Sequence, residues 1–270
     1  MRRFLTPKRR TWLHQANPAA KLALMILLFL LTLFTHRLDF IFYQALLFTF
    51  LLFLLSGYEP WKVALLLFPF ALIFASSAAT MILFGKGTEI WWSWGLFRIS
   101  EESFYRGIHI GFKAVAFAAE GLLFVLTTSS VALFYALMQQ AKLPPKYAYS
   151  FMASVRLLPM VWEELLVRRN ALLIRGVRRP RGLPGLVAQA KLYAVPLLSQ
   201  SIRRAHRVAV AMEAKAFDGN RPRTYYYPTA YSRYDVLTWL LIGLVAAAAY
   251  FLADLYPLFH IADVRYHEIL

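Results

Sequence analysis

The chain has 270 residues, of which 60% are hydrophobic and only 16% are charged, and its formal net charge is +16. Soluble domains contain about 45–50% apolar and about 25% charged residues, so this composition favours burial in lipid over a water-soluble core. The lack of cysteine excludes a disulfide framework and thiolate chemistry. In a membrane protein, an excess of Lys and Arg indicates cytoplasmic loops rather than a nucleic-acid partner.

Five apolar runs predict membrane-spanning helices, each of which needs about 20 mostly apolar residues. In chain order the runs cover residues 19–35, 40–55, 63–84, 107–126 and 236–255. No small-residue cleavage site follows a short apolar core, so no removable signal peptide is expected. The first run is therefore expected to act as both signal and anchor. The sequence therefore predicts an all-α integral membrane protein with about five transmembrane helices.

Lys and Arg are distributed unevenly between these runs. The first ten residues contain five of them, and residues 127–233 contain 17 with only four acidic residues. The hairpin 85–106 holds three basic and three acidic residues, and the tail after Asp254 holds one Arg and no Lys. The positive-inside rule therefore predicts a cytoplasmic N-terminus and an external C-terminus. We expect four spans in 1–126, a cytoplasmic domain in 127–233, and a last span with an outside tail in 234–270.

Two long amphipathic helices are predicted in the cytoplasmic domain. Apolar residues recur every three or four positions from Tyr147 to Leu173, and again from Leu186 to Met212. A turn over 178–185, with two Pro and two Gly, separates the two helices. The first helix is expected to end at Arg175–Gly176, where Gly suits a left-handed cap, and the second at Lys215–Ala216. A cation suits the carboxyl end of any helix, but two long helices that end alike favour a protein-docking role.

The sequence shows no recognisable catalytic or metal-binding pattern. Its six His are scattered, and it has neither a phosphate-binding glycine loop nor a nucleophile elbow. The chain is therefore predicted not to be an enzyme and to hold no metal or cofactor of its own.

Lys113 and Glu120 lie within the fourth apolar run. A charge within a span indicates either a functional site or a structural hydrogen bond to a neighbouring helix. Ser76, Ser77 and Thr80 of the third run are candidate partners for such bonds.

Short motifs occur before the first apolar run and along both amphipathic helices. They are Leu13-His14 with Asn17-Pro18 and Lys21, Arg156-Leu157-Leu158-Pro159 followed by Glu163 and Glu164, Ile174-Arg175-Gly176, and Ala211 to Phe217. Together these motifs resemble the transmembrane coupling (T) component of energy-coupling factor (ECF) transporters, the EcfT/CbiQ family, and the resemblance covers nearly the whole chain. Lys215 and Ala216 stand where the family pattern has Arg and Gly. Lys offers only a point charge in place of a planar fork of donors, which implies a looser second contact.

The resemblance implies a division of labour between several proteins. Two ABC-type ATPase subunits, or one fused chain with two ATPase domains, would bind ATP and Mg²⁺ beneath the helices. A small membrane S component would capture a vitamin, vitamin precursor or transition metal, and no nucleic acid would take part. The implied ATPase-coupling residues are Ile174, Arg175, Gly176, Ala214, Lys215 and Ala216, supported by Arg156, Pro159, Glu163, Glu164 and Glu213. The implied location is the cytoplasmic membrane of a prokaryote.

Two other classes of function stay open at this point. One is a membrane enzyme acting on lipid-linked substrates, for which Glu163, Glu164 and His206 are the candidate catalytic residues. The other is a solitary secondary transporter that uses Lys113 and Glu120, although no inverted repeat is evident in the sequence.

Overall fold

The computed structural model describes residues 7–85, 87, 90–94, 97–176, 182–218, 224–259, 261–264 and 268–269. Residues 178–181 of the expected turn lie outside the described residues. The elements are η1 (Trp12–Gln15), α1 (Pro18–Phe34), α2 (Leu38–Leu55), α3 (Pro60–Phe84), β1 (Ile90–Trp94), β2 (Phe97–Ser100), α4 (Glu101–Thr127), α5 (Ser130–Gln140), α6 (Pro145–Ile174), α7 (Leu183–Ala214), α8 (Arg233–Leu255), β3 (Ile261–Asp263) and β4 (Glu268–Ile269).

The chain divides into two compact units. The membrane unit comprises residues 1–133 and 229–270, and the crossed-helix unit comprises residues 134–228. The domain limits expected from the sequence, at 126/127 and 233/234, mark where the chain should leave and re-enter the membrane. They stay a prediction.

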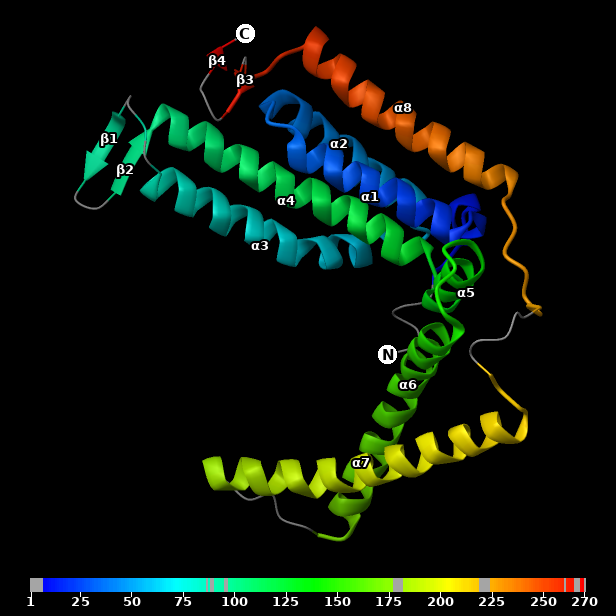
Figure 1. Cartoon of the computed structure of the whole chain (residues 1–270). Coiled ribbons are helices and arrows are strands. Elements are labelled where there is room, and N and C mark those ends of the chain that lie inside the picture. The colour runs from blue at the N-terminus through cyan, green and yellow to red at the C-terminus, as the bar shows by residue number, and fades with distance from the viewer. Residues whose placement is uncertain are drawn as a thin grey trace. The chain divides into compact units, whose positions relative to one another are not determined.

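The membrane unit is a bundle in which α4 is central. It packs against α1, α2 and α3, while α8 packs against α2 and α1, and Figure 1 shows these helices side by side. Gly107 and Gly111 on α4 let α3 approach closely. A Cβ added at Gly107 would lie 2.7 Å from Ile82, and one added at Gly111 would lie 2.6 Å from the Phe74 ring. Small residues four positions apart are a common device for close helix packing in membranes.

The spans agree with the prediction of an all-α membrane protein. Among the residues that the structure describes, four helices, α2, α3, α4 and α8, are long and apolar enough to cross a membrane. The fifth expected span, α1, is an apolar helix of 17 residues, or about 25 Å at 1.5 Å per residue, against about 30 Å for the hydrocarbon core. Two small antiparallel sheets, β1–β2 and β3–β4, accompany the helices. They were not expected, because strands of two to five residues are too short for an alternating pattern to be recognised.

Several helices of the membrane unit begin with caps that the sequence encodes locally. Asn17 accepts a hydrogen bond from the amide of Ala19 at the start of α1, where Pro18 takes the first helical position. Ser100 at α4 and Ser232 at α8 each form a reciprocal capping box with the residue three positions later. These caps fix where the spans start.

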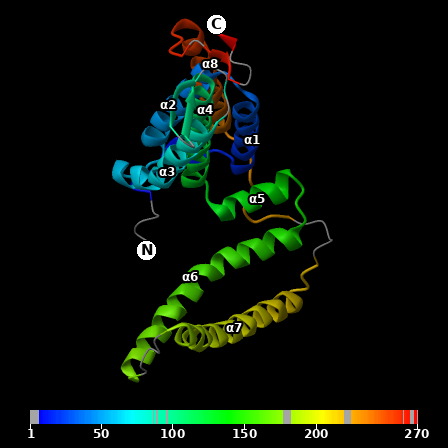
Figure 2. The same ribbon diagram turned by 90° about the vertical axis from the view of Figure 1, so that its left-hand side faces the viewer.

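The crossed-helix unit is built on α6 and α7, which have 30 and 32 residues. The two amphipathic helices expected from the sequence are thus confirmed, with starts two or three residues earlier than predicted. Figure 2 shows both as long, continuous helices, and they contact each other where they cross. The helix α5 was not predicted. Its Phe134 ring stacks on Phe151 of α6, with ring centroids 5.3 Å apart and an interplanar angle of 5°.

Candidate functional site

The carboxyl ends of α6 and α7 adopt the same local geometry. Arg175 is the C-cap of α6, with φ −73° and ψ 0°, and Lys215 is the C-cap of α7, with φ −93° and ψ 13°. The residue after each cation is in the left-handed region: Gly176 has φ 67° and Ala216 has φ 51°. The left-handed cap expected at Gly176 is therefore confirmed, and α7 repeats it without glycine.

Backbone hydrogen bonds show that the α7 end is a complete Schellman motif. The Ala216 amide donates to the Glu213 carbonyl at 2.8 Å, and the Phe217 amide donates to the Met212 carbonyl at 2.9 Å. At the α6 end the Gly176 amide donates to the Leu173 carbonyl at 3.1 Å, which is the equivalent first bond. Each cap thus places an exposed cation at the negative end of a helix dipole, where positive charge is favoured.

The two cations border different hollows. Arg175 lines a groove of about 540 Å³ between the helices, together with Glu163, Glu164 and Arg204. Lys215 lines a separate recess of about 410 Å³ with Met212 and other residues at the end of α7. The structure therefore places Glu163, Glu164 and Arg175 along one groove, whereas Lys215 borders the other hollow.

An ion pair joins the helices at their crossing. Arg204 of α7 donates from Nη2 to Oε1 of Glu164 on α6, and the side chains are only 20% and 18% exposed. Sequence reasoning picked out Glu164 but missed Arg204, because nothing local distinguishes Arg204 from the neighbouring cations of a basic helix. The pair links α6 to α7 through side chains that are largely withdrawn from solvent.

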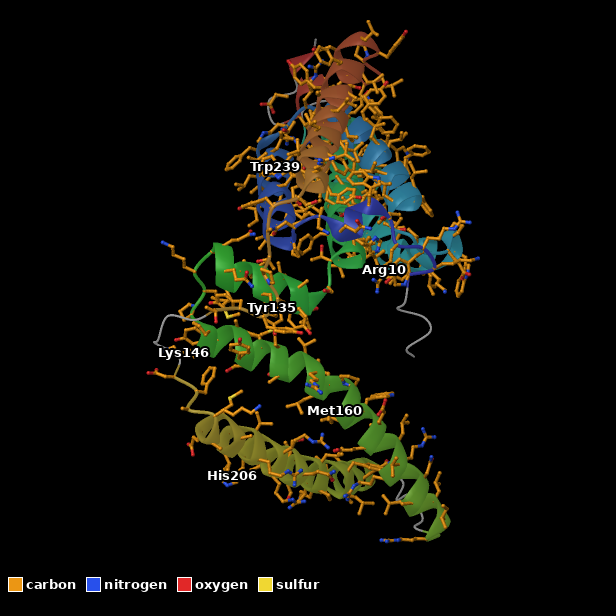
Figure 3. All side chains as sticks on the ribbon, turned by 90° about the vertical axis from the view of Figure 1, so that its right-hand side faces the viewer. Arg10, Tyr135, Lys146, Met160, His206 and Trp239 are labelled. Carbon is orange, nitrogen blue, oxygen red and sulfur yellow. The ribbon has the colours of Figure 1, made fainter. Side chains whose placement is uncertain are left out.

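The other supporting residues lie on exposed surfaces. Arg156, Glu163 and Glu213 are exposed, and Pro159 lies inside α6. Pro159 has no amide hydrogen, so the carbonyl four residues earlier loses its helical partner. Figure 3 shows Met160 on α6 and His206 on α7; Met160 lines the groove, but His206 does not. Of the three residues considered for an enzyme, Glu163 and Glu164 thus line this groove, and His206 is not among the residues that line it.

The charges within the fourth span are bonded to neighbouring helices. Lys113 donates to the carbonyl of Leu33 on α1 at 3.0 Å. Glu120 is completely buried, and its Oε1 accepts from Gln44 Nε2 of α2 at 2.6 Å and from Thr32 Oγ1 of α1 at 3.4 Å.

The bonds described for Glu120 do not involve the expected partners on α3. Ser77 and Thr80 donate to carbonyls of their own helix, at Ile73 and Ser76. Their hydroxyls therefore bond within α3, and the donors to Glu120 are Thr32 of α1 and Gln44 of α2. Nothing in the sequence of α1 or α2 indicated these partners. In the described ranges no group of three or more His, Asp or Glu could hold a metal ion.

Comparison with known proteins identifies the class to which these features belong. Residues 9–226 match the model of the CbiQ family, described as cobalt transport protein. Curated relatives include the energy-coupling factor transporter transmembrane protein EcfT of Ruminiclostridium cellulolyticum, 27% identical over 254 residues that cover 85% of this chain and 92% of that protein. EcfT of Brevibacillus brevis is 29% identical, covering 80% and 84%, and EcfT of Streptococcus thermophilus is 26% identical, covering 86% and 90%.

The fold and the sequence together define a multi-pass transmembrane component of a transporter. The chain belongs to the CbiQ/EcfT family, and it is the T component of an energy-coupling factor transporter.

Proposed function

We propose that the crossed-helix unit couples two ABC-type ATPase subunits, or one fused chain with two ATPase domains, to a substrate-binding S component in the membrane. Arg175 would enter a surface groove of one ATPase and Lys215 that of the other, each meeting a carboxylate. Closure of the ATPases on ATP would then move the helix ends and release substrate inside the cell. This chain would hold no cofactor and catalyse no reaction, since ATP and Mg²⁺ would be bound by the ATPases.

The observation that carries the proposal is the repetition of one cap geometry at two helix ends. Ordinary capping satisfies backbone carbonyls and needs no exposed side chain. Here each cap also presents a cation to solvent next to a left-handed residue. Two exposed cations with the same cap geometry, one at the end of each crossed helix, suit two equivalent ATPase partners.

Exposed apolar side chains on the same helices support a second partner in the membrane. Leu158 and Val167 of α6 are each 69% exposed, and Leu198 and Ile202 of α7 are 62% and 67% exposed. Apolar side chains exposed to this degree are typical of helices that contact another protein or the membrane. The S component would cover it and would select the substrate, which we propose to be a vitamin, a vitamin precursor or a transition metal.

The charge distribution supports the orientation. Residues 127–233 hold 17 Lys or Arg and four acidic residues, which favours the cytoplasmic side of a prokaryotic plasma membrane. The N-terminus would then lie inside and the C-terminus outside.

The test is charge reversal at one cap, compared with the same reversal elsewhere on the helix. The tagged chain is purified from its native membrane in mild detergent, and co-purifying proteins are identified by mass spectrometry. Arg175→Glu is expected to reduce recovery of ATPase chains at least tenfold, because reversing a paired interface charge costs about 2–5 kcal/mol.

Arg169→Glu provides the matched control. Arg169 is an exposed residue of the same helix, six positions before Arg175, and the change in net charge is identical. Recovery with Arg169→Glu should equal that of the unaltered chain. Equal recovery of ATPases with Arg175→Glu and Arg169→Glu would show that Arg175 does not dock them.

A further inference from the structure

The chain leaves the membrane unit after α4 and re-enters it before α8. These two connecting segments, 127–133 and 229–235, which we call the legs, link the membrane unit to α6 and α7, the helices proposed to couple the ATPases. Both legs meet the N-terminal segment 11–21, which precedes and begins α1. Figure 1 shows η1 next to the start of α8, as their contacts confirm, and Figure 3 labels Arg10, the residue just before this segment.

Lys21 binds the outgoing leg. Its side chain is 2% exposed, and Nζ donates to the carbonyls of Leu13 at 2.8 Å and Thr127 at 3.0 Å. Thr127 is the last residue of α4, so its carbonyl has no partner within the helix. A buried cation thus closes the negative end of α4 and joins it to the N-terminal segment.

Asp235 binds the returning leg to the same segment. It is 5% exposed and lies in the first turn of α8. Its Oδ1 accepts from the Asn17 amide at 2.5 Å, and its Oδ2 accepts from the Ser232 amide at 2.6 Å. Asn17 also donates from Nδ2 to the Ala230 carbonyl at 3.4 Å. The two sets of bonds are joined through the backbone, because the Lys21 amide donates to the Asn17 carbonyl at 3.0 Å, and the Asp235 carboxylate attracts the Lys21 ammonium electrostatically.

We propose that Lys21, Asn17 and Asp235 are positioning residues for coupling, forming a clamp that holds the two legs at a fixed separation. Burying two opposite charges costs free energy unless their hydrogen bonds are satisfied, which restricts the arrangement to one geometry. A displacement of the coupling helices then reaches α4 and α8 together instead of bending one leg alone. The coupling part of this inference rests on the function proposed above; the holding of the legs does not.

The lack of cysteine makes the clamp measurable. Spin labels on Ser130→Cys and Ala230→Cys, both at exposed positions in the membrane unit, report the separation of the legs. Pulsed electron-spin measurements are made on the complex purified from its native membrane, without nucleotide and with Mg-ATP and vanadate. The unaltered clamp should give one narrow distance distribution that nucleotide leaves unchanged.

Lys21→Met removes both donated bonds and should at least double the width of that distribution, while Lys21→Arg should restore it. Asp235→Asn keeps the size of the side chain and should also broaden the distribution, which provides a test if Lys21→Met prevents accumulation of the protein. A variant with a purely structural role would lower the yield and leave the distance in the folded complex unchanged. Unchanged widths in Lys21→Met or Asp235→Asn would overturn the clamp.

Co-purification of ATPases in the same samples tests the proposed function separately. ATPase recovery should be the same with Lys21→Met as with the unaltered chain, because the clamp lies outside the crossed-helix unit. A loss of ATPases from Lys21→Met alone would contradict that assignment. Absence of ATPases from the unaltered chain would overturn the coupling role, whereas broadening on Lys21→Met would still uphold the holding of the legs.

Discussion

Replacing Ala216 with glycine should strengthen the end of α7. Ala216 has φ 51°, a left-handed conformation that costs a residue with a Cβ roughly 1–2 kcal/mol. Glycine avoids this cost but loses more conformational entropy on folding, by about 0.5–1 kcal/mol. The difference favours Ala216→Gly by about 0.5–1 kcal/mol, which corresponds to a two- to fivefold shift of the local opening equilibrium at RT of about 0.59 kcal/mol.

Hydrogen exchange of the Phe217 amide measures this shift. That amide donates to the Met212 carbonyl inside the cap, so its exchange in detergent solution should slow two- to fivefold in Ala216→Gly. Faster exchange there would refute the strain that we assign to Ala216.

Gly176→Ala is the reciprocal control at the end of α6. A Cβ at Gly176 would have no atom within 4 Å, so the substitution introduces only backbone strain and no clash. Exchange of the Arg175 amide, which donates to the Ala171 carbonyl, should accelerate by a similar factor. Slower exchange would show that the two caps do not share one energetic basis.

Three further predictions concern buried polar groups. Glu164→Arg or Arg204→Glu should each lower the free energy of unfolding by about 1–3 kcal/mol. The double exchange should recover part of this loss, because it restores an opposite-charge pair. A double variant less stable than either single variant would contradict the ion pair. Glu120→Gln should retain the bond from Gln44, whereas Glu120→Ala should leave that buried donor unpaired at a cost of about 1–3 kcal/mol. Equal melting temperatures of the two variants would disprove the structural role of this hydrogen bond. Burial, and secondarily the Lys21 charge, lower the pKa of His14. The unfolded chain therefore takes up a proton near pH 6.5 before the folded chain does. Stability should fall as the pH drops below about 6.5, and His14→Gln should reduce that slope in pH-dependent unfolding.

Local patterns in the sequence were enough to predict the long helices and the ends of α6 and α7. The three- and four-residue spacing predicted α6 and α7 within two or three residues of their observed starts, because an amphipathic face must recur with the helical turn. The left-handed cap at Gly176 was also foreseen, since glycine adopts positive φ without steric cost. The helix α5 was missed because its 11 residues make only about three turns. That is too few for a helical repeat of apolar residues to distinguish it from a linker.

Long-range partners were beyond the reach of the same reasoning. Glu120 was recognised as a charge within a span, but its bonds to Thr32 and Gln44 join residues 88 and 76 positions away. The Lys21 bond to Thr127 spans 106 positions, and the Asn17 bond to Asp235 spans 218. Such pairs depend on how helices pack, and packing is set by the summed fit of many side chains.

The sequence by itself determined that the chain is a helical membrane protein with two amphipathic helices ending in cations, because hydrophobic length, periodicity and charge act locally along the chain. Only the tertiary structure decided that Arg204 meets Glu164 where α6 and α7 cross, that Lys21 bonds to the end of α4, and that Asp235 bonds to Asn17. A basic helix offers many equivalent cations, and a single span offers many equivalent carbonyls. The three-dimensional packing selects which of them are buried together and must therefore be paired.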